Sequence, residues 1–287
     1  YTLRPRKKGK YVIGSASVMA DGREMRTAPL TIEVVEGKSN QDSDRRLFVK
    51  AELSSTEAWI GQKIVLDYKL YITVDVETYT ISEESTYQGF YAEDIRRFDS
   101  RIMREVIDGV QYTTKVLKRT VLFPQQTGIL EIDPMYLQMG ISTKDPGRST
   151  SFYFNRQIQR LDITTERLEV KVKPLPGPIP DSFTGAVGKF GFRVSGIRSD
   201  ATTDDALSLK IEVSGNGDIK RVGAPVIDFP ESFEVYDPKI IEENTGETGG
   251  MLSGQKVFEY FLLPKSPGQY SFQPRFTYFD VDSTAFI

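Results

Sequence analysis

Several short stretches of the chain alternate apolar and polar residues, the period of a half-buried β-strand. In residues 64–72, apolar side chains face one way and polar ones such as Asp67 and Lys69 face the other. Residues 30–34, 168–172 and 207–213 show the same alternation. No stretch shows convincing long helical periodicity, so we predict an all-β protein.

One stretch, residues 91–106, fits two patterns. Its apolar residues have helical spacing, but Ile107-Asp108-Gly109-Val110 is typical of a two-residue hairpin turn, which requires a strand just before it. We predict a short helical turn near residues 91–97 and a strand from about Arg101. Three mostly polar stretches, residues 73–89, 140–151 and 240–254, are predicted to be irregular loops.

A short motif, Leu-x-Pro-x-x-x-Gly followed by β-type residues, occurs three times. The copies begin at Leu3, Leu122 and Leu262. Proline ends a strand because it cannot donate a ladder hydrogen bond, and glycine permits the positive φ of a tight corner. The motif predicts three equivalent corners with positive φ at Gly9, Gly128 and Gly268, and spacing of more than about 100 residues indicates repeated domains.

The corners and linkers predict tandem immunoglobulin-like β-sandwich domains, of which the terminal ones are incomplete. Residues 1–36 form the C-terminal strands of a first domain, with a turn at Asp21-Gly22, and the polar residues 37–46 form a linker. Residues 47–173 form a second sandwich, followed by the proline-rich linker 174–180. Residues 181–287 form a third sandwich, which is expected to be truncated and to lack its final strand.

The predicted core of the second sandwich follows from the phase of the alternation. These residues are expected to be buried: Ile64, Leu66, Tyr68, Leu122, Leu130, Ile132, Leu168 and Val170. Two strands alone are marginal in water, so residues 1–36 must pack on something. The options are the second domain, a part of the protein outside these residues, or a neighbouring molecule. The third option is donor-strand pairing of residues 29–35 with the open sheet edge of the C-terminal domain of the next molecule.

Composition narrows the chemistry. The 287 residues include no Cys and no His, and the net charge is −3. Disulfides, thiolate metal sites and Ser-His-Asp catalysis are therefore excluded, and net charge gives no drive toward nucleic acid. No run of about 18 apolar residues is present, so no part of this chain is predicted to span a membrane.

Three acidic or glycine-rich motifs have a structural and a chemical interpretation. Glu83 and Glu84 are neighbours on an extended chain and point to opposite faces, which favours solvation over acid–base work. Asp280 and Asp282 begin like a calcium loop but lack its further ligands. The turn 214–218 (SGNGD) lacks the residues of a phosphate loop. We predict no catalytic, cofactor-binding or metal-binding residues.

Two further features of the sequence could be interpreted as binding sites. Basic residues near the start could touch an acidic partner, but protection of an exposed strand edge by charge is the favoured interpretation; they are Arg4, Arg6, Lys7, Lys8 and Lys10. The single Trp59 is expected to be core rather than a sugar platform.

Three stretches together resemble one family. They are residues 174–190, with Phe183-Thr-Gly-Ala-Val-Gly-Lys-Phe190; residues 107–128, with Leu122-Phe-Pro-Gln-Gln-Thr-Gly128; and residues 26–34. This pattern is similar to the BatD family of the Bacteroides aerotolerance operon. The resemblance implies a periplasmic protein, anchored in the inner membrane by a segment outside this chain. It also implies protein partners: Bat-type membrane proteins with von Willebrand A domains and, functionally, a MoxR-type ATPase.

Two functions are carried forward. The first is a non-enzymatic periplasmic scaffold or adaptor of a Bat-type membrane complex linked to aerotolerance and stress resistance, without cofactor or nucleic acid. The alternative is a carbohydrate-binding β-sandwich module, which requires exposed coplanar aromatics, for example among Trp59, Tyr87, Phe90 and Tyr91. A glycosidase using two carboxylates is a distant third possibility.

Overall fold

The computed structural model describes residues 9–20, 23–34, 46–143, 157–196, 198, 200–248 and 250–287. Nearly all of these residues lie in or between β-strands, and the helical element among them is one 3-10 turn, η2 (Ile219–Arg221). The predicted all-β class is therefore confirmed. The chain divides into two compact units, Tyr1–Arg45 and Arg46–Ile287. The finer domain bounds stay a prediction, as does the immunoglobulin-like character of the domains.

The first unit contains an N-terminal ribbon of two strand pairs. β1 (Gly9–Ile13) pairs antiparallel with β4 (Leu30–Val34), and β2 (Ser17–Ala20) with β3 (Arg23–Arg26). Leu30 lies opposite Ile13 of the same chain. Donor-strand pairing of residues 29–35 with another molecule was therefore a wrong expectation, because this strand is already paired within its own molecule.

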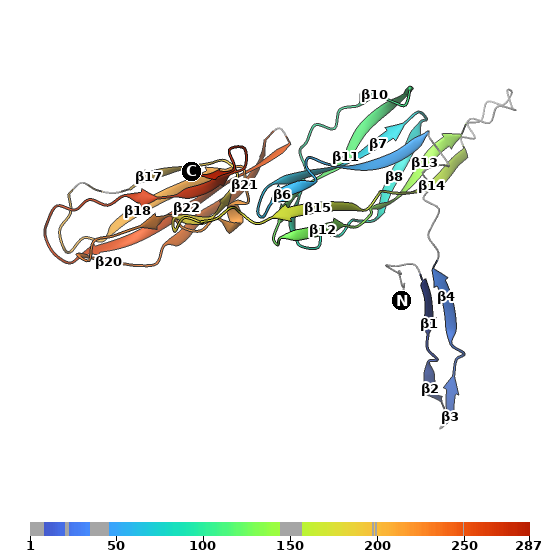
Figure 1. The fold of residues 1–287 in the computed structure, drawn as a ribbon, viewed down its shortest axis with the longest axis horizontal. Helices are drawn as coiled ribbons and strands as arrows, with labels where there is room; N and C mark the ends of the chain where they lie inside the picture. Colours follow the sequence, from blue (N-terminus) through green and yellow to red (C-terminus); the bar gives the residue numbers. More distant parts are fainter. Residues whose placement is uncertain are drawn as a thin grey trace. The chain divides into compact units, whose positions relative to one another are not determined.

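Two layers of strands form the middle sandwich (β5–β15), drawn in blue to yellow-green in Figure 1. One layer has the order β10-β11-β7-β5, and β9 also pairs with β11. Its strands are β5 (Leu47–Leu53), β7 (Ile64–Ile72), β9 (Phe90–Ile95), β10 (Met103–Ile107) and β11 (Val110–Pro124). The facing layer comprises β6 (Glu57–Trp59), β8 (Val76–Glu83), β12 (Gly128–Ile132), β13 (Tyr136–Thr143), β14 (Gln157–Thr164) and β15 (Leu168–Lys173).

The core of the middle sandwich matches the predicted set. Seven of its eight residues are buried, and Leu168 is partly buried against them. Tyr68 is fully enclosed, and its hydroxyl donates to Ser85 Oγ at 2.6 Å, so the polar end of the ring is satisfied. The period-2 alternation therefore assigned the inner face correctly.

The C-terminal sandwich (β16–β25) has the same two-layer plan. One layer has the order β17-β18-β22-β20, and β21 also pairs with β22. Its strands are β17 (Phe190–Ser195), β18 (Leu207–Gly215), β20 (Phe233–Val235), β21 (Lys239–Thr248) and β22 (Met251–Pro264). The facing elements are β16 (Phe183–Val187), β19 (Val226–Ile227), β23 (Pro274–Arg275), β24 (Thr277–Asp280) and β25 (Ala285–Phe286).

The two sandwiches share a pairing scheme. β11 pairs with β7 along one edge and with β9 and β10 along the other, and β22 does the same with β18, β20 and β21. β15 runs parallel to β6, and β24 runs parallel to β16. The expectation that the third sandwich lacks its final strand is therefore wrong, because β24 occupies the corresponding place.

The N-terminal ribbon repeats one strand pair of the middle sandwich in register. The matched cross-strand pairs, first in β1–β4 and then in β12–β15, are Gly9–Val34 and Gly128–Val172, Tyr11–Ile32 and Leu130–Val170, and Ile13–Leu30 and Ile132–Leu168. Apart from Gly128, the middle-sandwich members lie in its core, whereas their ribbon counterparts are mostly exposed. This agreement supports the interpretation of residues 1–36 as the closing strands of a like domain.

The loop predictions for residues 73–89 and 240–254 and the helical turn were wrong, and the loop predicted for residues 140–151 was wrong over residues 140–143. Residues 91–97 begin in β9 rather than in a helical turn, and residues 73–89 contain β8. Residues 140–143 continue β13, and residues 144–156 lie outside the described part. Residues 240–254 form most of the long β21–β22 hairpin; β21 is exposed along most of its length, so it carries no apolar alternation.

The predicted positive φ is found at two of the three corner glycines. Gly128 has φ +113° and Gly9 has φ +153°, as predicted. Gly268 does not have a positive φ, so the prediction was wrong there. Pro5 lies outside the described residues, and the superposition of the first corner stays a prediction. The turn at Asp108 (φ 50°) and Gly109 (φ 80°) is the expected hairpin turn with two positive φ values.

Candidate functional site: the junction of the two sandwiches

The acidic motifs that were considered as possible catalytic or metal-binding groups do not lie together in one site. The Glu84 carboxylate forms an ion pair with Lys118 in the middle sandwich. In the C-terminal sandwich, Asp280 accepts from the Asp282 amide at 3.0 Å and Asp282 pairs with Lys189 at 2.6 Å. Among the residues that the structure describes, no group of three acidic side chains is placed to hold a metal ion.

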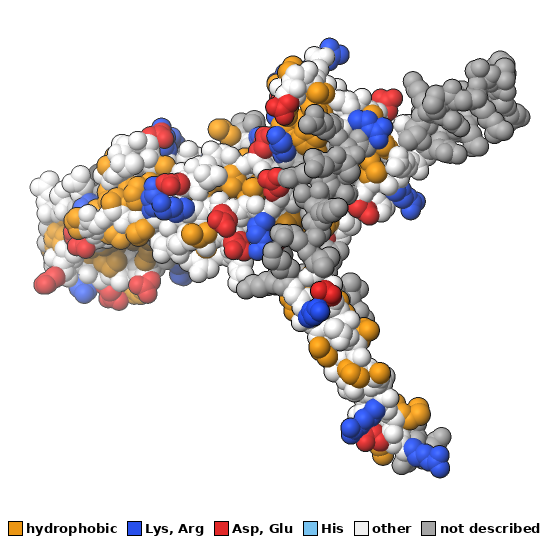
Figure 2. Space-filling model, turned by 45° about the vertical axis from the view of Figure 1, so that its right-hand side comes forward, with side chains coloured by type: hydrophobic (Ala, Val, Ile, Leu, Met, Phe, Trp, Pro, Cys, Tyr) orange, Lys and Arg blue, Asp and Glu red, His pale blue; other side chains and the backbone are white. Residues whose placement is uncertain are grey.

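The glycine-rich turn and the basic cluster have structural partners. Asp218 of the turn caps η2, accepting from the Lys220 amide at 3.2 Å, and Asn216 Oδ1 accepts from the Lys189 amide at 2.8 Å. Of the basic cluster, Lys10 lies within the described residues; it is exposed and 3.9 Å from Glu33. Figure 2 shows basic and acidic side chains mixed on the visible face, rather than gathered by sign.

The four aromatic residues proposed as a sugar platform are only partly exposed. Tyr87 and Phe90 pack against the core of the middle sandwich, and Tyr91 stacks on Phe123 with ring centroids 6.1 Å apart. Trp59 makes an edge contact with Phe279, centroids 5.4 Å apart. The four rings therefore pack against the protein and do not form the exposed coplanar set that carbohydrate binding requires.

The contacts of Trp59 and Tyr91 belong to a junction between the two sandwiches. Its centre is the tip of the β21–β22 hairpin, which carries Leu252 onto the outer face of β11, the face turned away from the middle-sandwich core. Leu252 is buried there with Ile95, Val121 and Phe123. This small cluster is separate from the two sandwich cores, so the hairpin has an apolar seat of its own.

The hairpin is also held by polar contacts. The Glu247 carboxylate of β21 accepts from the backbone amides of Arg96 at 3.1 Å and Arg97 at 2.8 Å. These two amides follow the end of β9, so a carboxylate from the C-terminal sandwich satisfies donors that β9 leaves open. Hydrogen bonds to a charged acceptor are stronger than neutral ones.

Gly250 forms the turn of the hairpin and fits between Phe98 and Arg119. Its φ is +77°, and a Cβ there would lie 2.8 Å from Arg119 Nη1 and 3.2 Å from Phe98 Cβ. Arg119 is held in place by two bonds of 2.6 Å to the Asp67 carboxylate, and this hydrogen bonding raises the pKa of Arg119. Only glycine suits both the backbone and the space at this turn.

A second group of contacts comes from η2. The Lys220 ammonium donates to the Tyr91 hydroxyl and lies 3.6 Å from Glu93, and the bond to Tyr91 raises the pKa of Lys220. Arg221 donates to Gln125 Oε1, next to the Pro124 corner. Basic side chains of the C-terminal sandwich thus meet polar and acidic groups at one end of the middle sandwich.

Two buried charged side chains, Lys256 and Asp218, bond to the backbone of η2 and the residues beside it. Lys256 is almost fully buried, and its ammonium donates to the carbonyls of Lys220 at 3.0 Å and Val222 at 3.1 Å and pairs with Glu243 at 3.0 Å. Burial is the main influence on the Asp218 carboxyl and raises its pKa. A buried ammonium with three acceptors is a satisfied structural group.

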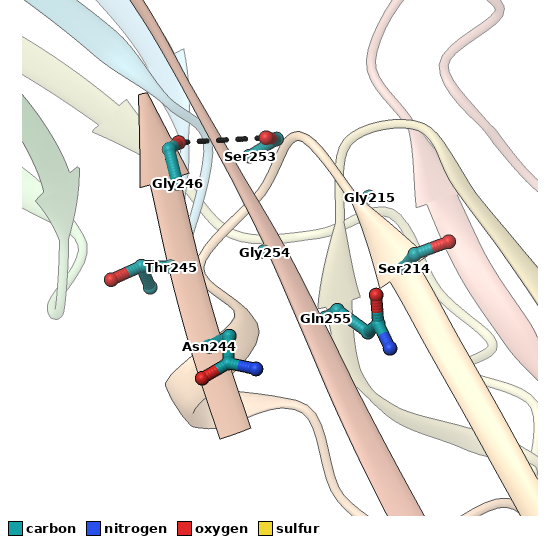
Figure 3. Close-up of a pocket in the computed structure, with 8 residues that line it drawn as sticks. All are labelled: Ser214, Gly215, Asn244, Thr245, Gly246, Ser253, Gly254 and Gln255. Atoms are coloured by element: carbon teal, nitrogen blue, oxygen red, sulfur yellow. Dashed lines mark hydrogen bonds between the residues drawn. The ribbon is translucent and has the colours of Figure 1, made fainter. Parts of the chain in front are cut away.

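The other face of the hairpin borders a shallow polar groove of about 470 Å³ (Figure 3). Ser214, Gln255 and Asn244 lie opposite one another on β18, β22 and β21, and Ser253 Oγ is 3.5 Å from the Gly246 carbonyl. The groove has no charged lining residue. It provides hydrogen-bonding groups but no acid, base or nucleophile pair.

The junction was missed from the sequence. Ile95 was assigned to helical spacing and Leu252 to a loop, because their partners come from a distant part of the chain. The double glycine at 249–250 followed by Met251 and Leu252 is the local signal of a hairpin tip with an apolar contact. The arrangement is a contact between two surfaces of the same chain.

Comparison with known families supports the resemblance found in the sequence. A family model described as BatD, BatD DUF11-like domain, matches residues 1–34 and 195–285. The two matched segments cover the N-terminal ribbon and most of the C-terminal sandwich, and together make up less than half of the chain. The match supports membership of the chain in the BatD family. No curated protein matches the chain.

Proposed function

We propose that this protein is a non-enzymatic scaffold or adaptor of the cell envelope, acting through protein–protein contacts in a Bat-type membrane complex. The observation that carries the proposal is the docked β21–β22 hairpin. It joins two sandwiches through an apolar seat and a carboxylate that caps two amides. Such a junction gives a fixed spacing between surfaces, which a scaffold needs and an isolated binding module does not.

The proposed location is the periplasm, with an inner-membrane anchor supplied by a segment outside these residues. The described residues contain no helix that is long and apolar enough to cross a membrane. The proposed partners are Bat-type membrane proteins with von Willebrand A domains, together with a MoxR-type ATPase as a functional partner. The proposed role is in aerotolerance and stress resistance, and it is supported by the BatD match.

The non-enzymatic part of the proposal is supported by the side chains. His and Cys are absent from the sequence, and the most enclosed charged group, Lys256, is paired and aimed at backbone carbonyls. Tyr71, between Glu52 and Glu105, is buried with its hydroxyl bonded to Glu52 at 2.6 Å. Burial raises the pKa of Tyr71 far above its ordinary value, which opposes its ionisation.

Crosslinking in cells tests the proposal. Under oxygen stress, the wild-type protein should be recovered from membranes with Bat-type proteins. Leu252→Asp places a charge in the junction and should reduce this recovery, whereas the matched variant Met251→Asp, on the exposed neighbour, should not. Recovery of the wild type without any Bat-type or ATPase partner would contradict the proposed function.

A further inference from the structure

The β10–β11 hairpin of the middle sandwich is the counterpart of the docked β21–β22 hairpin. In each hairpin, two residues separate the two strands, and the second strand ends at a proline corner. The corner is at Pro124 for β11 and at Pro264 for β22. The second residue pair from the turn is Val106–Gln111 in one hairpin and Glu247–Leu252 in the other. Val106 therefore holds the position of Glu247. In the β21–β22 hairpin, this side contacts the middle sandwich.

This side of the β10–β11 hairpin is exposed and carries the apolar Ile102 and Val106, with the exposed Gln111 opposite Val106. Ile102 is 71% exposed and Val106 67%, with the exposed Arg104 between them along the same side. By contrast, Leu252 on the equivalent side of β22 is 4% exposed, because it is seated on the middle sandwich. The corresponding side of the β10–β11 hairpin is thus not covered by any of the described residues.

The matching seat is found at the other end of the same unit. Counting from the proline corners, Phe261 and Leu263 of β22 hold the positions of Val121 and Phe123 of β11. Val121 and Phe123 are fully buried beneath Leu252, but Phe261 and Leu263 remain partly exposed. Tyr236, whose amide donates to the Phe261 carbonyl at 3.1 Å, is 48% exposed beside them.

One basic residue of the hairpin side has acidic counterparts beside the seat. Arg104 is on the hairpin side, and Glu234 lies opposite Leu263 on the receiving face, where the middle sandwich has Tyr91 opposite Phe123. Asp237 follows on the same exposed segment. Arg104 of the hairpin can therefore meet Glu234 and Asp237 at one border of the seat. The Lys239 ammonium lies 6.0 Å from the centre of the Phe261 ring, so the border of the seat has charges of both signs.

We propose that a second copy of this chain docks head to tail. The β10–β11 hairpin of one copy lies on the Tyr236–Phe261–Leu263 face of the next, as β21–β22 lies on β11 within one chain. A second copy is the occupant argued for, because both halves of the contact are present on one molecule and the chain already shows the docked geometry. Such a contact is heterologous: one end of each assembly keeps an unoccupied hairpin and the other end an unoccupied seat. Repeated contacts of this kind therefore build open linear assemblies.

Sedimentation velocity of the 287-residue chain over a range of concentrations tests this contact. The wild type should self-associate. Val106→Asp, in the hairpin, and Tyr236→Asp, in the seat, should each weaken self-association at least about tenfold. Ile129→Asp is the matched control: Ile129 is also exposed, but it lies on β12 in the facing layer, and this variant should associate like the wild type.

Mixing the two variants gives the sharper result. Val106→Asp keeps an intact seat and Tyr236→Asp an intact hairpin, so an equimolar mixture should form a dimer and stop there. Thermal midpoints equal to the wild type show that each variant is folded. A wild type that is monomeric at every concentration, a mixture that stays monomeric, or equal losses in Ile129→Asp would overturn the proposal. So would a monomeric wild type whose hairpin variant loses a different protein partner.

Discussion

The carboxylate of Glu247 accepts a hydrogen bond of 2.8 Å from the backbone amide of Arg97, linking the C-terminal sandwich to the end of β9. It accepts a second bond, from the amide of Arg96. A single side chain thus satisfies two neighbouring donors on the other sandwich. Polar contacts of this kind set the orientation of the hairpin, while Leu252 supplies the apolar area.

Glu247→Gln should therefore weaken the junction. The amide retains an acceptor oxygen but loses the charge, and we expect a loss of about 1–2 kcal/mol in the free energy of unfolding. Urea denaturation measures it. Glu242→Gln, on the same strand, is the control because Glu242 accepts from Asn244 on the other face of β21. Equal effects from the two variants would mean that the Arg96 and Arg97 contacts contribute nothing specific.

Gly250→Ala should be destabilising by more than about 1 kcal/mol, because φ is +77° and the added Cβ would meet Arg119 and Phe98. Gly246→Ala, in the same hairpin, is a matched control: φ is not positive and no atom lies within 4 Å of the added Cβ. Thermal unfolding compares the two. A smaller loss for Gly250→Ala than for Gly246→Ala would show that the turn is not held between Phe98 and Arg119.

Leu122→Ala should cost about 2–5 kcal/mol, because Leu122 is fully buried in the middle core and its truncation leaves a cavity. Ile129→Ala, on an exposed side chain of β12, should cost much less. Denaturation midpoints in urea report the difference. An unchanged midpoint for Leu122→Ala would refute its place in the core.

Gly128→Ala tests the proline corner. The glycine has φ +113°, which strains any other residue, although nothing lies within 4 Å of the added Cβ. We expect a loss of about 1 kcal/mol from backbone strain alone. Gly191→Ala is the control, with the same open space and no positive φ. If the two variants have the same stability, backbone conformation at the corner is not limiting.

Asp218→Asn should change the pH dependence of stability. Burial raises the pKa of Asp218 above 3.8 in the folded state, so the ionised carboxylate costs stability at neutral pH, and this cost disappears as the pH falls below 3.8. Asparagine keeps the cap on η2 without the charge. The variant should therefore exceed the wild type at pH 7, by a margin that vanishes in acid. A margin that is constant with pH would contradict the buried-carboxylate account.

The sequence predicted what local alternation encodes. Residues 64–72 and 207–213 carry one apolar face each, so their strands and buried residues could be assigned before the structure was known. The proline corner at 124–128 and the turn at Asp108-Gly109 were predicted because glycine and proline act on the backbone directly.

The junction could not be predicted in this way. Tyr91 and Ile95 point to the outer face of their sheet, where they are covered by a hairpin from more than about 100 residues away, so their apolar character resembled helical spacing. β21 has no core face of its own along most of its length and resembled a polar loop. Both errors arise from contacts between distant segments, which no local pattern reports.

The β21–β22 hairpin is proposed to hold the two sandwiches in one fixed arrangement. Because the chain contains no Cys, spin labels can be placed at Ile129→Cys and Val194→Cys, which are exposed sites on the two sandwiches. Pulsed electron spin resonance measures the distance between the labels. We predict a single narrow distribution that broadens when Leu252→Asp is added. A distribution that is already broad without Leu252→Asp, or one that Leu252→Asp leaves unchanged, would contradict the claim.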